Sequence, residues 1–238
     1  MRKNVFITGL PRSGKSTLLK KLVSGPGPKV GFVTSEIRQA GERVGFEMET
    51  HLGNHFILAH VDIKTPRQVS RYFVDVQALE LMIPQVSVFR ASQLLYIDEI
   101  GQMQLFSPSF CELVSRFLDS GNTLLATLSC VYQHDFIESL KRRDDIILVE
   151  ITPENREKQG IFVAEFLRKI EKAKRYVSEP HRFAKRGWQI ELQSEHGFRR
   201  IYFDGQVWVC NCGFYAQHGI CSHTIATQEY CQSGGGQI

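Results

Sequence analysis

The sequence predicts an α/β fold with a mainly parallel sheet and helices on both faces, followed by a small second unit. Three observations support this prediction. Near the N-terminus, a glycine-bounded loop joins an apolar strand to a helix over residues 5–23. From there to residue 170, short apolar runs alternate with amphipathic segments, as in parallel sheets whose strands are connected by helices. The run at residues 94–99 ends in two acids, which is typical of a buried strand that presents carboxylates at its C-terminal end.

The individual elements follow from apolar periodicity and from turn and capping residues. We expect strands at residues 5–8, 30–34, 44–50, 56–59, 94–99, 123–128 and 146–150, and helices at residues 15–23, 75–90, 107–118, 135–142 and 153–170. Pro84 should break or kink the second of these helices. Pro108 and Pro153 instead lie at helix starts, where proline is favoured, and Thr152 is the expected N-cap of the last helix.

The loop at residues 9–17 has the pattern of a phosphate-binding loop. Gly9, Gly14, Lys15 and Ser16 fulfil the spacing G-x-x-x-x-G-K-[ST], and the backbone N–H groups of such a loop form a nest for anions at a helix N-terminus. We expect Lys15 to reach the β- and γ-phosphates as a catalytic residue, and the Ser16 hydroxyl to bind Mg²⁺. The full set of expected nucleotide contacts is Gly9, Leu10, Pro11, Arg12, Ser13, Gly14, Lys15, Ser16 and Thr17. The alternative is an ordinary glycine turn before a helix.

Two carboxylates at the end of the strand at residues 94–99 complete the predicted chemistry. Asp98 fits the acid that holds Mg²⁺ opposite Ser16, and Glu99 fits a general base that activates water. The alternative for this pair is an acidic cap at a strand end. Thr127, at the end of a later strand, could contact the γ-phosphate or position the water, and the alternative is a capping hydroxyl. The sequence therefore predicts cleavage of a γ-phosphate by water.

The bulk composition is that of an ordinary globular protein. Of the 238 residues, 42% are hydrophobic and 23% charged. Because no apolar run is long enough for a membrane span and no signal-peptide pattern opens the chain, we expect a cytoplasmic monomer without membrane contact. A net charge of +4 is too small to predict a nucleic-acid partner by itself. Cys111 and Cys130 are expected to be small buried hydrophobic residues.

Five separated segments share motifs with one family. They are GFVTSEIR at residues 31–38, RVGF at 43–46, VDVQALE at 74–80, DEIGQMQL at 98–105 and TPENR at 152–156. In order and spacing they resemble the THEP-type nucleoside triphosphatases, over residues 3–170. The resemblance implies a RecA-like P-loop fold, a three-layer sandwich, and Mg²⁺-dependent hydrolysis of ATP, GTP and other nucleoside triphosphates to diphosphate and phosphate. By motif position, it points to Arg38 as an arginine that stabilises the γ-phosphate, with Arg43 second; a solvated loop arginine is the alternative for both.

Three residues depart from the family pattern. Arg12 stands where the family's loops usually have glycine, so it adds a cation beside the phosphates or only a solvent-facing side chain. Gln102 and Gln104 replace a lysine and a glutamate that are usual after the acidic pair. The loss of both charges together suggests a lost salt bridge, and it puts any charged contact to the nucleotide there in doubt.

The residues after the last expected helix form a second unit. We expect a P-loop NTPase domain at residues 1–172, a basic linker at 173–183, a small module at 184–232 and a disordered tail at 233–238. Basic residues gather over residues 168–186, a pattern that is usually a solvated helix end but also suits contact with nucleic-acid phosphates. In the module we expect strands at 187–193, 198–203 and 206–209 and a helix at 225–230.

The module carries a predicted zinc site. Its candidate ligands are Cys210, Cys212, Cys221 and His223, with the spacing C-x-C-x(8)-C-x-H. This pattern resembles the SWIM zinc finger, and three thiolates with one imidazole would make a closed structural site. About 50 residues form too small a core without such a staple. His218 competes with His223, Cys231 is left over, and the alternative is disulfide pairing or chance clustering.

The predicted function combines the two units. We expect a Mg²⁺-dependent nucleoside triphosphatase whose structural Zn²⁺ module binds nucleic acid (DNA or RNA) or protein, as SWIM modules are associated with such partners. The aromatic residues Trp188, Phe198, Tyr202, Trp208 and Tyr215 offer stacking surfaces or form the core of the module. One alternative is a nucleotide or small-molecule kinase, which would normally show an arginine-rich lid. Another is a nucleotide-gated binding switch in which hydrolysis is incidental.

Overall fold

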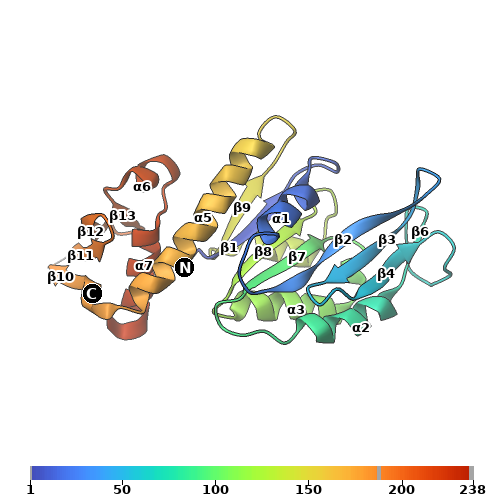
Figure 1. The fold of residues 1–238 in the computed structure, drawn as a ribbon, viewed down its shortest axis with the longest axis horizontal. Helices are drawn as coiled ribbons and strands as arrows, with labels where there is room; N and C mark the ends of the chain where they lie inside the picture. The colour runs from blue at the N-terminus through green and yellow to red at the C-terminus, as the bar shows by residue number, and fades with distance from the viewer. Residues whose placement is uncertain (1, 187–188, 236–238) are drawn as a thin grey trace. The chain divides into compact units, whose positions relative to one another are not determined.

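The computed structural model describes residues 2–186 and 189–235 and divides into two compact units. One unit consists of residues 3–160, and the other is built from the residues after 160. Both are drawn in Figure 1. The division falls inside helix α5 (Arg156–Val177), so the expected domain boundary at residue 172 stays a prediction. None of the helices in the described residues is long and apolar enough to cross a membrane.

A nine-stranded sheet forms the centre of the first unit. Its strands are β1 (Asn4–Thr8), β2 (Lys29–Gln39), β3 (Glu42–Thr50), β4 (His55–His60), β5 (Gln68–Val69), β6 (Tyr72–Val74), β7 (Leu94–Ile100), β8 (Thr123–Leu128) and β9 (Ile146–Glu150). They lie in the order β5-β6-β4-β3-β2-β7-β8-β1-β9. The neighbouring strands β2, β7, β8, β1 and β9 pair in parallel. Strands β3, β4, β6 and β5 extend this sheet beyond β2 as antiparallel strands.

Helices cover both faces of the parallel part. They are α1 (Lys15–Val23), α2 (Val76–Val86), α3 (Pro108–Asp119) and α4 (Asp135–Lys141), with a 3₁₀ turn at Gln104–Phe106. The connection from β1 through α1 runs across the sheet in the opposite direction to the connections through α2, α3 and α4. Because crossovers between parallel strands are right-handed, α1 lies on one face and α3 and α4 lie on the opposite face, where α2 packs against α3, as Figure 1 shows for α1, α2 and α3.

The parallel strands place the predicted site residues at one edge of the sheet. Strands β1 and β8 are buried along their whole length, as expected for strands covered on both faces. The loop after β1, Asp98 near the end of β7 and Thr127 near the end of β8 therefore meet at the carboxyl edge. The fold is thus an α/β fold with a mostly parallel central sheet.

Several elements differ from the sequence prediction. Strand β2 continues five residues beyond Thr34 and turns through Ala40 and Gly41, both with positive φ (48° and 84°), into β3. The short strands β5 and β6 were not expected, and helix α5 begins at Arg156 because residues 153–155 form a turn capped by Thr152 and Asn155. Cys130 is exposed and Cys111 half-buried, so the prediction of two buried cysteines is wrong for Cys130.

The second unit carries a small antiparallel sheet. Its strands follow one another as β10 (Phe183–Arg186), β11 (Gln189–Ser194), β12 (Gly197–Phe203) and β13 (Trp208–Cys210). Two short helices follow, α6 (Gly213–His218) and α7 (Ser222–Tyr230), then a π-helical turn at Cys231–Gly235. Trp188 and residues 236–238 of the expected tail lie outside the described residues. Phe198 and Tyr202 are exposed rather than part of the core.

Candidate functional site

The loop between β1 and α1 has the backbone shape of an anion nest. Gly9 and Gly14 have positive φ values of 143° and 99°. A Cβ atom on Gly9 would lie 2.3 Å from the carbonyl oxygen of Ile151, so only glycine fits this position. Gly14 is the N-cap of α1 and makes no side-chain cap. The first N–H groups of α1 are therefore available to a bound anion.

Lys15 is buried at the start of α1, with its ammonium group turned back onto the loop. Its Nζ donates to the carbonyl oxygens of Gly9 (2.9 Å) and Leu10 (3.2 Å). A phosphate oxygen in the loop would give the same ammonium group a charged acceptor, and such hydrogen bonds are stronger than those to a neutral carbonyl. Lys15 is thus positioned to bind a phosphate chain.

Asp98 connects the loop helix to two strands. Its Oδ1 accepts hydrogen bonds from the hydroxyls of Ser16 (2.9 Å) and Thr127 (2.6 Å), and its backbone oxygen accepts one from Thr34. The side chain is only 1% exposed, yet its Oδ2 has no hydrogen-bond partner among the described residues. A buried carboxylate oxygen without a partner is costly. The Ser16 hydroxyl and this carboxylate are oxygen ligands of the kind that Mg²⁺ prefers, so the residues present fit the cation.

The two carboxylates have shifted acidities. Burial raises the pKa of Asp98, against the lowering effect of its hydrogen bonds from Thr127 and Ser16 and of the nearby charge of Lys20. Burial also raises the pKa of Glu99, while the charge of Lys15 lowers it. Raised values bring a carboxylate closer to the pKa of an effective general base near neutral pH.

Glu99 is placed by a glycine two residues further on. A Cβ atom on Gly101 would lie 2.6 Å from the Oε1 of Glu99, so the absence of a side chain at position 101 leaves room for this carboxylate. The peptide bond between Asp98 and Glu99 is cis. No hydrogen bond from another described residue holds the Glu99 carboxylate, which leaves it available to a water molecule.

One cleft of about 890 Å³ brings most of the predicted residues together. Its lining includes Pro11, Arg12, Gly14, Lys15, Ser16, Thr17, Asp98 and Glu99. Gln102 and Gln104 also line it. Of the remaining predicted loop residues, Leu10 is 67% exposed, and Ser13 is buried with a hydroxyl that has no partner among the described residues.

The candidate arginines lie beyond the phosphate loop. Arg38 pairs with Glu36 (2.5 Å) on the exposed part of β2 and does not line the cleft. Arg43 pairs with the same Glu36 (2.8 Å), donates to the Tyr72 hydroxyl (2.9 Å) and does line the cleft. The structure thus brings the second candidate to the cleft wall and leaves Arg38 beside it.

Some site residues were missed or incompletely described by the sequence prediction. Thr127 donates to Asp98, a contact that the sequence prediction did not include. Thr34 was not considered at all, although it ends the predicted strand at residues 30–34 and the carboxyl ends of neighbouring parallel strands meet. The segment after β8 also lines the cleft through Ser129, Val131 and Tyr132.

A cluster of thiols and one imidazole occupies the second unit. Its members are Cys210, Cys212, Cys221 and His223, whose ligand atoms all lie within 4.8 Å of one another. The sulfur atoms of Cys210 and Cys221 are both 3.6 Å from the Nδ1 of His223. In a tetrahedral zinc site, neighbouring ligand atoms lie roughly 3.5–3.8 Å apart. The cluster therefore fits a tetrahedral metal ion.

Helix starts position these ligands. Cys212 caps α6 and Cys221 caps α7, and their sulfur atoms accept the N–H groups of Tyr215 and Thr224 at 3.4 Å. Hydrogen bonding with Cys210 and then with His223 lowers the pKa of Cys221, whereas the same bond raises the pKa of Cys210. Cys221 is therefore the first of these thiols to become the thiolate that metals require.

The two spare residues lie outside the cluster. His218 packs against the rings of Phe162 and Phe214, at 5.0 and 4.4 Å between centroids. Neither His218 nor Cys231 belongs to the ligand group found in the described residues. The ring of His223, in contrast, is buried and stacks on Tyr176 at 6.0 Å.

Comparison with protein-family models matches residues 4–162 to a family described as NTPase. Among curated proteins, the nucleoside-triphosphatase THEP1 of Thermotoga petrophila is 36% identical over 169 residues, which cover 69% of this chain and 94% of that protein. The human cancer-related nucleoside-triphosphatase is 34% identical over 174 residues, or 66% of this chain and 92% of that protein.

Two solved structures have the same fold as the first unit. The crystal structure of THEP1 from Aquifex aeolicus has a TM-score of 0.63 at 32% identity and covers 69% of this chain and 98% of its own. The solution structure of the human cancer-related nucleoside triphosphatase has a TM-score of 0.58 at 31% identity and covers 68% and 96%. The α/β fold described above is therefore that of P-loop NTPases.

Proposed function

The chain belongs to the NTPase family, and we propose that it cleaves nucleoside triphosphates to diphosphate and phosphate with the help of Mg²⁺. The observation that carries this proposal is the arrangement around Asp98: Ser16 and Thr127 share one carboxylate oxygen, and the other is buried without a partner among the described residues. Ser16 and Asp98 would hold the cation. Mg²⁺ bound there neutralises charge that develops on the phosphate oxygens.

The remaining residues have distinct proposed roles. The N–H groups of the loop and Lys15 bind the β- and γ-phosphates, and Lys15 exchanges its carbonyl partners for phosphate oxygens. Glu99 accepts the proton of the attacking water, for which its raised pKa suits it. Arg38 is the proposed arginine for the transition state, and Arg43 is the alternative because it lines the cleft. The proposal also includes a RecA-like topology and a broad substrate range. It further includes a cytoplasmic location and a monomeric state.

The role of Glu99 is tested by phosphate release from ATP and GTP under saturating Mg²⁺. Glu99→Gln should lower kcat by about 10²–10⁴-fold, because the amide cannot take the proton, while nucleotide affinity stays the same. Glu112→Gln, an exposed position on α3, is the matched control and should keep full activity. Unchanged phosphate release by Glu99→Gln would remove Glu99 from the mechanism. A kinase would instead need an added acceptor for diphosphate formation.

The second unit is proposed to be a SWIM-type zinc module that binds nucleic acid, with protein as the alternative partner. On β12, Phe198 and Tyr202 are exposed with Arg200 between them, and alternation along a strand puts the three on one face. Exposed aromatic rings beside an arginine suit stacking with single-stranded bases. Fluorescence anisotropy with a labelled single-stranded oligonucleotide should show weaker binding for Phe198→Ala and Tyr202→Ala. Equal binding by both variants would favour a protein partner.

A further inference from the structure

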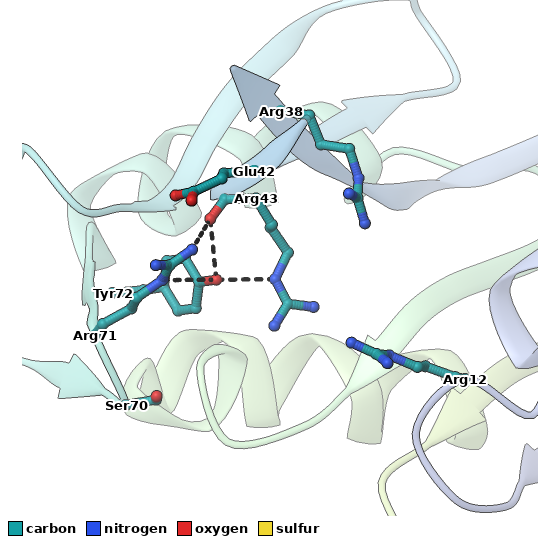
Figure 2. A pocket seen from close by; sticks show the side chains of 7 residues that line it. All are labelled: Arg12, Arg38, Glu42, Arg43, Ser70, Arg71 and Tyr72. Carbon is teal, nitrogen blue, oxygen red and sulfur yellow. Dashed lines mark hydrogen bonds between the residues drawn. The ribbon is translucent and has the colours of Figure 1, made fainter. Parts of the chain in front are cut away.

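A second, smaller pocket adjoins the nucleotide cleft, and Figure 2 shows it from close by. Its volume is about 380 Å³, and it is lined by Arg12, Arg38, Glu42, Arg43, Ser70, Arg71 and Tyr72. These residues come from the phosphate loop, the β2–β3 hairpin and the segment around β5 and β6. Arg12 and Arg43 line both the pocket and the cleft, so the two spaces meet at these side chains.

Positive charge predominates in this pocket. Four of its lining side chains are guanidinium groups and one, Glu42, is an acid. Glu36 neutralises part of this charge through its pairs with Arg38 and Arg43. Arg12 and Glu42 form no ion pair with any described residue. Positive charge therefore remains in excess, and an anion that enters would relieve the repulsion between the guanidinium groups.

A hydrogen-bond network holds two of the arginines in place. The hydroxyl of Tyr72, a largely buried residue, accepts from the Nε of Arg43 (2.9 Å) and of Arg71 (3.3 Å). Burial acts to raise the pKa of Tyr72, but these two bonds outweigh it and lower the pKa, as expected in positive surroundings. Arg43 also lies over the ring of Phe46 at 5.0 Å. Guanidinium groups held in advance lose less conformational entropy when they bind a ligand.

The guanidinium groups of Arg12, from the phosphate loop, and of Arg38 and Arg43, from the β2–β3 hairpin, point toward one space in Figure 2. Planar guanidinium groups suit the paired oxygens of phosphate. We propose that this pocket binds a phosphate dianion separate from the phosphates of the nucleotide. The dianion is either the orthophosphate that hydrolysis releases or the phosphomonoester group of a second molecule. Arg12, which departs from the family pattern, would then serve this second site. Arg38 and Arg43 would be shared with the transition state of hydrolysis, in which one of them is proposed to act.

The test is a calorimetric titration of the full chain whose phosphate loop is saturated with Mg²⁺ and a non-hydrolysable triphosphate, adenosine 5′-(β,γ-imido)triphosphate. Inorganic phosphate is the first titrant and glycerol phosphate the second. We expect one phosphate per chain, bound more weakly as salt increases. Arg71→Gln should weaken binding several-fold, because it removes one of the four positive charges of the pocket without removing a group that faces the phosphate. Glu42→Gln should tighten binding several-fold, because it removes the acid.

The control is Arg142→Gln, which removes an exposed arginine outside the pocket and should leave phosphate affinity unchanged. Binding of glycerol phosphate as well as orthophosphate identifies a second molecule as the source, whereas orthophosphate alone identifies the product. Phosphate that binds only when the loop is empty, or equal affinities for Arg71→Gln, Glu42→Gln and the unchanged chain, would overturn the proposal. Because no turnover is measured, phosphate binding is tested independently of hydrolysis, and only the assignment of orthophosphate as the product rests on the proposed function.

Discussion

The cleft around Asp98 and the cysteine cluster both present ligands suited to a cation, but different parts of the structure hold those ligands in place. Ser16, Asp98 and Thr127 belong to α1, β7 and β8, which a large buried core fixes. The four ligands of the cluster lie at the end of a short strand and in the first turns of two short helices. We therefore expect a cation in the cleft to arrive with a substrate, and a cation in the cysteine cluster to be part of the fold.

The two sites also differ in how their charged groups are stabilised when no cation is bound. Asp98 is a buried carboxylate with a raised pKa and an oxygen that lacks a partner among the described residues, so the cleft carries a cost when no cation is bound. In the cluster, N–H groups at helix starts already contact Cys212 and Cys221. The large core of the first unit can sustain such a local cost, whereas a unit of about 80 residues has little stability to spare.

Removal of the metal should give the largest difference between the two units. Chelation of zinc, or Cys221→Ser, should unfold the second unit, since zinc binding contributes roughly 10–16 kcal/mol in small zinc modules. Cys231→Ser, outside the cluster, should keep about one zinc per chain. Amide NMR spectra and bound zinc are the measurements, and the first unit's signals should persist. A second unit that keeps its dispersed signals without metal would contradict the zinc proposal.

The phosphate loop offers the next largest effect. Gly9→Ala should destabilise the first unit by roughly 2–4 kcal/mol, because its Cβ atom would meet the Ile151 carbonyl at 2.3 Å. The matched control is Gly25→Ala, where the nearest atom lies 3.9 Å away and φ is not positive. Thermal unfolding followed by calorimetry compares the two variants. Equal stabilities would show that the loop relaxes more easily than its backbone geometry indicates.

Replacement of Asp98 should change the stability of the protein by less than Gly9→Ala does, and in the opposite direction. Because the pKa of Asp98 is raised in the folded state, the native protein binds this proton more tightly than the unfolded chain does. Its ionisation therefore lowers stability as pH rises from the ordinary range of aspartate through the raised value. Asp98→Asn should stabilise the cation-free protein at pH 7 by about 1 kcal/mol and abolish Mg²⁺-dependent activity.

Denaturant unfolding in a chelator, at pH 4 and pH 7, measures the effect of Asp98→Asn. The difference between the variant and the unchanged chain should shrink at the lower pH, where Asp98 is increasingly protonated. A variant less stable than the unchanged chain at pH 7 would mean that the hydrogen bonds from Ser16 and Thr127 need the charge. Mg²⁺ should close the gap by stabilising the unchanged chain alone.

Local signals explain which parts of the fold were predictable. The strands at 123–128 and 146–150 coincide with β8 and β9, because polar or charged residues precede both apolar runs. The end of β2 was missed because Ser35–Gln39 is mostly polar, and its strand form depends on pairing with β3. Strands β5 and β6 are too short to show any periodicity.

The same distinction holds for the site. The loop and the acids Asp98 and Glu99 have motif spacing, so the sequence alone predicts their cleft. Arg12, Arg43 and Arg71 line one pocket because the antiparallel strands β3, β5 and β6 bring Arg43 and Arg71 close to the phosphate loop. No short sequence motif predicts this arrangement. The burial of Cys130 could not be predicted from its neighbours in the sequence. This residue lies two residues after β8 and contacts the Gly9 carbonyl from an exposed position.

The lack of a side chain at Gly101 suggests a variant that binds the nucleotide without cleaving it. A methyl group at this position would displace the Glu99 carboxylate, because its Cβ atom would lie 2.6 Å from Oε1, while Lys15, Ser16 and Asp98 keep their places. Gly101→Ala should therefore bind nucleoside triphosphate with unchanged affinity and retain it uncleaved. Equilibrium binding of a fluorescent nucleotide and single-turnover phosphate release would measure this. Such a chain would be a substrate trap, suited to capturing whatever associates with the loaded protein.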